Sequence, residues 1–123
     1  MLDRDDDACL SQIDCHTPAG RIAALNDAFR RYRTSGQLAV TAGVIALGHD
    51  ALPAILEQVA TFCAFDDGND PYGEHDFGSF AYRDARLFWK IDYYDRTLTH
   101  GSSDPADPAV TTRELTVMLA AEY

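Results

Sequence analysis

The sequence predicts an α+β domain in which a three-stranded, mainly antiparallel sheet accompanies three helices, in the order α-β-α-β-β-α. Two stretches carry apolar residues at spacings of three and four, the period of a helix with one buried face. Further along, a stretch that alternates apolar and polar residues follows another strand-like segment across a short polar turn, which is typical of an antiparallel hairpin. The 123 residues suit one domain, predicted at 18–123 after an acidic flexible arm at 1–17.

The first predicted helix begins at Thr17-Pro18, where a hydroxyl suits the N-cap and proline suits the first helical position. Ser35-Gly36 is expected to end it. One face of this helix is predicted to be buried: Ile22, Leu25, Phe29 and Tyr32.

A strand is predicted over residues 37–45 (QLAVTAGVI), because β-branched residues are frequent there. Its apolar character predicts a position inside the sheet. A second helix is predicted from about Ala51 to Phe62, with Asp50 as the candidate N-cap. Its buried stripe is predicted to be Leu52, Ile55, Leu56, Val59 and Phe62.

Two strands are predicted at 77–82 and 87–94, joined by a turn at 83–86. One face of the second strand is predicted to point to the core: Leu87, Trp89, Ile91 and Tyr93. The other face is predicted to be aromatic and charged: Phe88, Lys90, Asp92 and Tyr94. A last helix is predicted from Thr111, because Thr111 and Glu114 have the spacing of a capping box. Its buried stripe is predicted to be Leu115, Met118 and Leu119.

The charge of the chain is strongly negative, with 20 acidic residues against 10 Lys and Arg and a net charge of −10. Between Asp50 and Asp76 there are seven acids and no Lys or Arg. Such a surface repels phosphate backbones, so direct binding to nucleic acid is not expected, whereas a basic protein surface would be attracted.

Cellular location is predicted from the cysteines and from hydropathy. Three cysteines without a CxxC pair favour reduced thiols over a disulfide scaffold. No apolar run is long enough to cross a membrane, and the acidic start differs from an ordinary secretory signal. A cytoplasmic protein is therefore expected.

Ligand-type side chains gather around the predicted hairpin: Glu74, His75, Asp76, Asp92, Asp95 and His100. These types suit a metal site, or a histidine that a carboxylate orients for general-base work. However, the chain contains no HExxH, CxxC, P-loop, GxSxG or GxGxxG motif. The favoured interpretation is structural, with histidines bonded to loop carbonyls and aspartates forming turns, so no catalytic residue, metal ion or cofactor is predicted.

Three stretches of the chain are long and distinctive: NDPYGEHDFG at 69–78, FWKIDYYDRTLTHGSSDPADP at 88–108 and RELTVMLAAEY at 113–123. In these the chain resembles the DUF3768 family, small bacterial proteins without established function. The resemblance extends from about Arg21 to Tyr123. It implies no active site, but it implies a context, because similar proteins are encoded on plasmids and other mobile elements of alphaproteobacteria, often among anti-restriction genes.

This context predicts a counter-defence protein of the anti-CRISPR or anti-restriction type, which binds the basic nucleic-acid-binding surface of a host defence effector. An acidic and aromatic face is predicted to contact this partner: Asp66, Asp67, Asp70, Tyr72, Glu74, His75, Asp76, Asp92, Tyr94 and Asp95.

Two alternatives stay open. One is a small metal-assisted or acid–base enzyme, for which four residues are the candidates: His75, Asp76, Asp92 and His100. The other is a homodimeric scaffold or regulatory protein whose aromatic face associates with a second copy. Binding is favoured over catalysis, because none of the familiar catalytic motifs is present.

Overall fold

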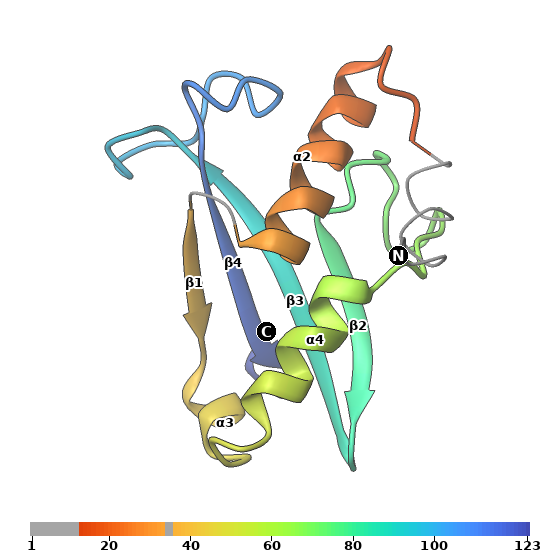
Figure 1. The fold of residues 1–123 in the computed structure, drawn as a ribbon, viewed down its shortest axis with the longest axis vertical. Coiled ribbons are helices and arrows are strands. Elements are labelled where there is room, and N and C mark those ends of the chain that lie inside the picture. Colours follow the sequence, from red (N-terminus) through yellow and green to blue (C-terminus); the bar gives the residue numbers. More distant parts are fainter. Residues whose placement is uncertain (1–12, 34–35) are drawn as a thin grey trace.

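A four-stranded sheet with two helices packed over one of its faces forms the framework of the molecule (Figure 1). A computed structural model describes residues 13–33 and 36–123. Residues 1–12, most of the predicted acidic arm, lie outside this described part. The α+β class predicted from the sequence is confirmed, but the sheet has one strand more than predicted.

The helices and strands follow one another in this order: α2 (Pro18–Tyr32), β1 (Gln37–Val40), α3 (Ala42–Ile45), α4 (Leu52–Thr61), β2 (Phe77–Tyr82), β3 (Ala85–Tyr94), β4 (Thr112–Leu119) and the 3₁₀ turn η1 (Ala120–Glu122). In the sheet they lie in the order β1-β4-β3-β2. The β1–β4 pair is parallel and the other two pairs are antiparallel, so the sheet is mixed.

Helix α2 begins where the sequence predicts, but it ends at Tyr32, before the predicted Ser35-Gly36, of which Ser35 lies outside the described residues. The Thr17 hydroxyl accepts a hydrogen bond of 3.0 Å from the Gly20 N–H, which satisfies one of the free amides of the first turn. At the other end Arg33 has a left-handed backbone and donates its N–H to the Phe29 carbonyl.

The predicted strand at 37–45 is wrong in its length and its position. Strand β1 stops at Val40 and lies at the edge of the sheet, and the chain then turns into the short helix α3. The Glu122 carboxylate stabilises the turn out of the strand, because it accepts hydrogen bonds from the Thr41 hydroxyl (2.6 Å) and the Gly43 N–H (3.1 Å). A partner 79 residues further along the chain could not be read from the local pattern.

The predicted last helix is also wrong, because Thr112–Leu119 is strand β4. This strand lies between β1 and β3 and has alternate residues facing the core: Arg113, Leu115 and Val117. The Thr111–Glu114 spacing matches a capping box by coincidence. As a strand, this segment forms backbone hydrogen bonds to both β1 and β3, and this pairing outweighs the local preference for a helix.

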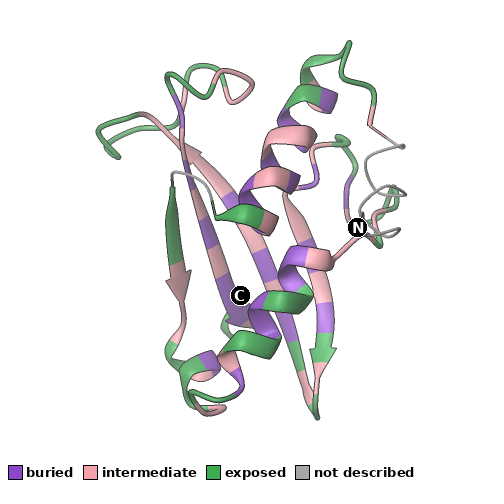
Figure 2. Ribbon diagram, viewed as in Figure 1, coloured by how far each residue is buried: buried purple, intermediate pink, exposed green. Residues whose placement is uncertain are grey.

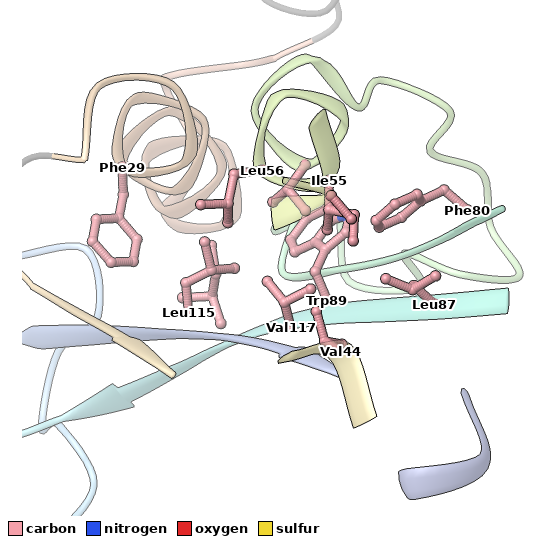
Figure 3. Packing of buried hydrophobic residues seen from close by; sticks show 12 residues of the cluster. Phe29, Val44, Ile55, Leu56, Phe80, Leu87, Trp89, Leu115 and Val117 are labelled. Atoms are coloured by element: carbon pink, nitrogen blue, oxygen red, sulfur yellow. The ribbon is translucent and has the colours of Figure 1, made fainter. Parts of the chain in front are cut away.

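The hairpin is confirmed, with strands at 77–82 and 85–94 and a turn of two residues, Arg83-Asp84, that is shorter than predicted. The predicted core face of β3 is confirmed as well. Leu87, Trp89 and Ile91 are buried in the core cluster, and Tyr93 is partly buried against it. Figure 2 marks the buried parts of the ribbon, and Figure 3 shows Leu87 and Trp89 packed with side chains of the same cluster. Gly78 lies opposite Trp89, and a Cβ at Gly78 would collide with the indole nitrogen.

Two further observations bear on the location predicted from the sequence. Cys63 is disulfide-bonded, which corrects the expectation of reduced thiols, whereas Cys15 is free and exposed. Within residues 13–33 and 36–123, none of the helices is both long and apolar enough to cross a membrane.

Candidate binding site: the acidic pocket around His75

The loop between α4 and β2 is held in shape by its own aspartates. Asp66 Oδ1 accepts hydrogen bonds from the N–H groups of Gly68 and Asn69, both at 2.9 Å. Asp70 Oδ1 accepts from the N–H groups of Glu74 and His75, both at 3.0 Å. These turns are the structural role predicted for the acids, and they fold the loop back towards α2.

His75 is buried and bound on one edge to α2. Its Nδ1 lies 3.0 Å and 3.1 Å from the two carboxylate oxygens of Asp27. Its ring is stacked on Phe65, with ring centres 3.8 Å apart and planes 8° from parallel. Since an ionised carboxylate only accepts hydrogen bonds, Nδ1 carries a proton. The other ring nitrogen, Nε2, lies on the opposite edge of the ring and faces Asp70.

Asp27 is kept ionised by its neighbours although it is completely buried. Burial by itself raises the pKa of Asp27, but the hydrogen bond from His75 and the charge of Arg30 outweigh burial and hold the pKa below its usual value. Arg30 Nη2 lies 2.6 Å from Asp27 Oδ1.

Arg30 joins α2 to α4 and to the core. Its Nη1 donates to the carbonyls of Val59 (2.6 Å) and Phe62 (3.0 Å), and its guanidinium lies 4.6 Å from the centre of the Trp89 ring. Hydrogen bonds at the end of α4 and a cation–π contact thus compensate the burial of this charge.

A second polar network attaches the same loop to α2 and β4. Asn26 Nδ2 donates to the Glu74 carbonyl (2.9 Å) and to the Tyr93 hydroxyl (2.8 Å), and Arg113 Nε donates to Asn26 Oδ1 (2.6 Å). The Tyr93 hydroxyl in turn donates to Glu74 Oε1 at 3.1 Å. Burial, with the nearby acids, holds the pKa of Tyr93 well above its usual range, so this donor keeps its proton.

A cavity of about 380 Å³ opens between this loop and the start of α2. Several aspartates and aromatic or small residues line it, and no Lys or Arg is among its described lining residues: Ile13, Asp14, Thr17, Ala19, Gly20, Phe65, Asp66, Asp67, Asp70, Tyr72, Gly73 and His75. We call this cavity the acidic pocket. Its size is within the usual range for small-ligand sites.

The ten residues predicted to contact a partner do not form one face. Half of them line the acidic pocket: Asp66, Asp67, Asp70, Tyr72 and His75. Glu74 is bound in the Asn26 network. Asp92 and Tyr94 lie on the other face of the sheet, and Asp95 accepts hydrogen bonds from the N–H groups of Thr97 and Thr99 in its own turn.

Asp76 lies in acidic surroundings just before β2. Burial raises the pKa of its carboxyl, and the negative charges of Glu74, Asp70 and Asp92 raise it further. The ionised form of Asp76 is therefore destabilised by repulsion from these neighbouring carboxylates.

The four residues of the enzyme alternative are bound in separate groups. His75 pairs with Asp27, and Asp92 pairs with Lys90 at 3.0 Å. His100 is 85% exposed and lies 3.7 Å from Asp95. In the part of the chain that the structure describes, no three His, Cys, Asp or Glu side chains are placed to hold a metal ion.

Four residues of this site were not predicted from the sequence: Asn26, Asp27, Arg30 and Arg113. One signal was available, since Asp27 and Arg30 have the i,i+3 spacing at which opposite charges meet on a helix. The other contacts described above join positions between 29 and 87 residues apart, so no local pattern contained them.

The fold and this site define a two-layer α+β domain in which a buried histidine–carboxylate pair borders an acidic pocket. The chain belongs to the DUF3768 family, described as a protein of unknown function, whose model matches residues 40–122. The match begins at the end of β1 and therefore does not include α2, which supplies Asp27. Neither a curated protein nor a solved structure matches the chain.

Proposed function

We propose that this protein is an acidic binding module that docks on a basic protein surface, of the kind with which a defence effector holds DNA or RNA. The observation that carries the proposal is the acidic pocket, where four aspartates meet without a lining Lys or Arg: Asp14, Asp66, Asp67 and Asp70. Tyr72 is 80% exposed beside them, and tyrosine is a frequent contact residue in interfaces.

Electrostatics favours such a partner over nucleic acid itself. With a net charge of −10 the molecule repels phosphates and attracts positive surfaces, and complementary charge accelerates association and selects the partner. An acidic module on the nucleic-acid-binding surface of an effector would exclude the effector's substrate. This is the counter-defence role that the resemblance implies.

The test uses the full chain and a panel of purified nucleases from restriction and CRISPR systems. We expect the protein to bind at least one nuclease, to inhibit its binding to DNA, and to lose about tenfold or more in affinity between about 0.1 M and about 0.5 M NaCl. Absence of binding to every nuclease, or an affinity that does not depend on salt, would contradict the proposal.

A pair of double variants locates the contact. Asp14→Asn with Asp67→Asn removes two exposed acids that line the acidic pocket, and we expect it to weaken binding. Glu57→Gln with Asp84→Asn is the matched control, since it removes the same charge from exposed positions on α4 and in the hairpin turn. Equal weakening by both double variants would mean that only the net charge matters.

A further inference from the structure

We propose that the acidic pocket binds a guanidinium or ammonium group, supplied by an Arg or Lys side chain of the basic partner. The inference rests on the proposed function and assigns to it the site of the central contact. The buried end of the pocket is formed by His75 and Asp70, whose side chains are 7% and 6% exposed.

Two polar atoms at this end face each other across a gap. His75 Nε2 and Asp70 Oδ2 are 3.8 Å apart, which is longer than a hydrogen bond. The other atoms of both groups are engaged, since Nδ1 pairs with Asp27 and Oδ1 accepts two backbone N–H groups. Neither Nε2 nor Oδ2 has a hydrogen bond to another residue of the described chain. A buried polar atom gains free energy from such a partner.

A nitrogen with two N–H bonds fits this gap. Two atoms 3.8 Å apart can each lie about 2.9 Å from a third atom, the usual length of an N–H···O bond. One N–H then donates to the Asp70 carboxylate, and the other donates to His75 Nε2 in the tautomer that carries its proton on Nδ1. Guanidinium and ammonium groups both carry such nitrogens and have no acceptor, which suits a site formed by a carboxylate oxygen and the Nε2 of this tautomer.

The charges around the pocket favour a cationic ligand over a neutral one. The charge of Asp27 is compensated by Arg30 behind His75, whereas the four aspartates of the pocket have no Lys or Arg among the described lining residues. A cationic ligand would compensate the negative charges of these aspartates, which a neutral ligand cannot do. Tyr72 also lines the pocket, and an aromatic ring there offers a cation–π contact.

The experiment titrates the isotope-labelled full chain with Nα-acetyl-L-arginine amide and Nα-acetyl-L-lysine amide, and follows the histidine ring resonances by NMR. Nα-acetyl-L-citrulline amide is the control ligand, because it has the shape of the arginine compound without its charge. The chain contains four histidines, of which His49 and His100 serve as internal controls. We expect the His75 resonances to shift with a cationic ligand and to remain in place with citrulline.

Two conservative variants test the contact atoms. Asp70→Asn keeps the Oδ1 acceptor for both backbone N–H groups and removes the charge, and we expect about tenfold or more weaker binding of the cationic ligand. His75→Asn keeps an N–H for Asp27, and asparagine tolerates the left-handed backbone at this position (φ 56°), but Nε2 is lost, so binding should weaken as well. Asp84→Asn is the control variant and should bind as the wild type does.

Several results would overturn the inference: equal binding of citrulline, equal shifts at all four histidines, no shift at His75, or unchanged binding by Asp70→Asn. Competition then identifies the source of the cation. If the partner supplies it, excess arginine compound should displace the nuclease, whereas citrulline with NaCl at equal ionic strength should not. A ligand that occupies the pocket without affecting the nuclease would point to a free small cation and overturn the assignment to a partner side chain.

The two proposals can fail separately. Nuclease binding that depends on salt and on Asp14 and Asp67, combined with no response of His75, would leave the proposed function standing and remove the contact at His75 and Asp70. Arginine binding at His75, combined with no nuclease bound by the protein, would contradict the proposed function and leave a cation pocket without that partner.

Discussion

Asp27 on α2 connects this helix, through Arg30 and His75, to α4 and to the loop between α4 and β2. It is completely buried and contacts both Arg30 and His75, and Arg30 continues to the carbonyls at the end of α4. Removing one member of such a buried pair leaves an uncompensated charge and costs about 3–5 kcal/mol. The pair therefore holds the candidate site on the core, and His75 can keep its orientation only while Asp27 and Arg30 are in place.

Asp76 yields a prediction at the same scale. Its pKa is raised in the folded state by burial and by neighbouring acids, so the folded state binds its proton more tightly than the unfolded state does. The associated stability is present at low pH and is lost as the pH rises from the usual value of 3.8 through the folded pKa. We therefore expect Asp76→Asn to be more stable than the wild type at pH about 7.

Urea denaturation at several pH values measures this difference. The advantage of Asp76→Asn should disappear below about pH 3.8, where the carboxyl is protonated in both states. Asp84→Asn, in the exposed hairpin turn, is the control. A variant that is less stable than the wild type at neutral pH would show that Asp76 makes a favourable contact as an ion.

Strand β4 is the element that decides the architecture. It pairs with β1 on one side and β3 on the other, and Val117 lies in its buried row. A helix over the same residues would instead have placed the predicted stripe against the core: Leu115, Met118 and Leu119. The strand accounts for the burial of Arg113 and Val117, which that stripe did not contain.

Val117→Ala tests the importance of this strand. Val117 is 0% exposed, so removing two methyl groups and leaving a cavity should cost about 2–3 kcal/mol of unfolding free energy. Val110→Ala is the control, since Val110 is 37% exposed in the preceding loop, and we expect a cost of about 0.5 kcal/mol or less. Similar costs for both variants in urea denaturation would contradict the position of Val117 in the core.

The two faces of the sheet differ, because helices cover one of them and leave the other open (Figure 1). Helices α2 and α4 cover one face of the sheet (Figure 1). The acidic pocket lies on this side, between the start of α2 and the loop that precedes β2. The other face carries the Lys90–Asp92 pair and an aromatic group of Phe77, Phe88 and Tyr123. The predicted partner residues are divided between these two sides, so a single flat partner could engage the pocket or the open face but not both.

The net charge of −10 has a consequence for stability. Repulsion among surface carboxylates favours the unfolded chain, and salt screens it, whereas the buried Asp27–Arg30 pair is screened much less. We expect the Tm to rise when NaCl is increased from about 0.02 M to about 0.3 M. A triple variant with Asp67→Asn, Glu57→Gln and Asp84→Asn should show a smaller rise, and a Tm that falls with salt would contradict this account.

The sequence by itself determined the α+β class, α2 with its Thr17 cap, α4, the hairpin and the core face of β3. These features are encoded by residues within one turn or one strand of each other, so local chemistry is sufficient to predict them. The net charge of −10 also follows directly from the sequence. Only the tertiary structure decided the rest, because β4 takes its conformation from two neighbouring strands and His75 takes its role from Asp27, 48 residues away on α2. Burial in a shared core, rather than local pattern, brings these groups together.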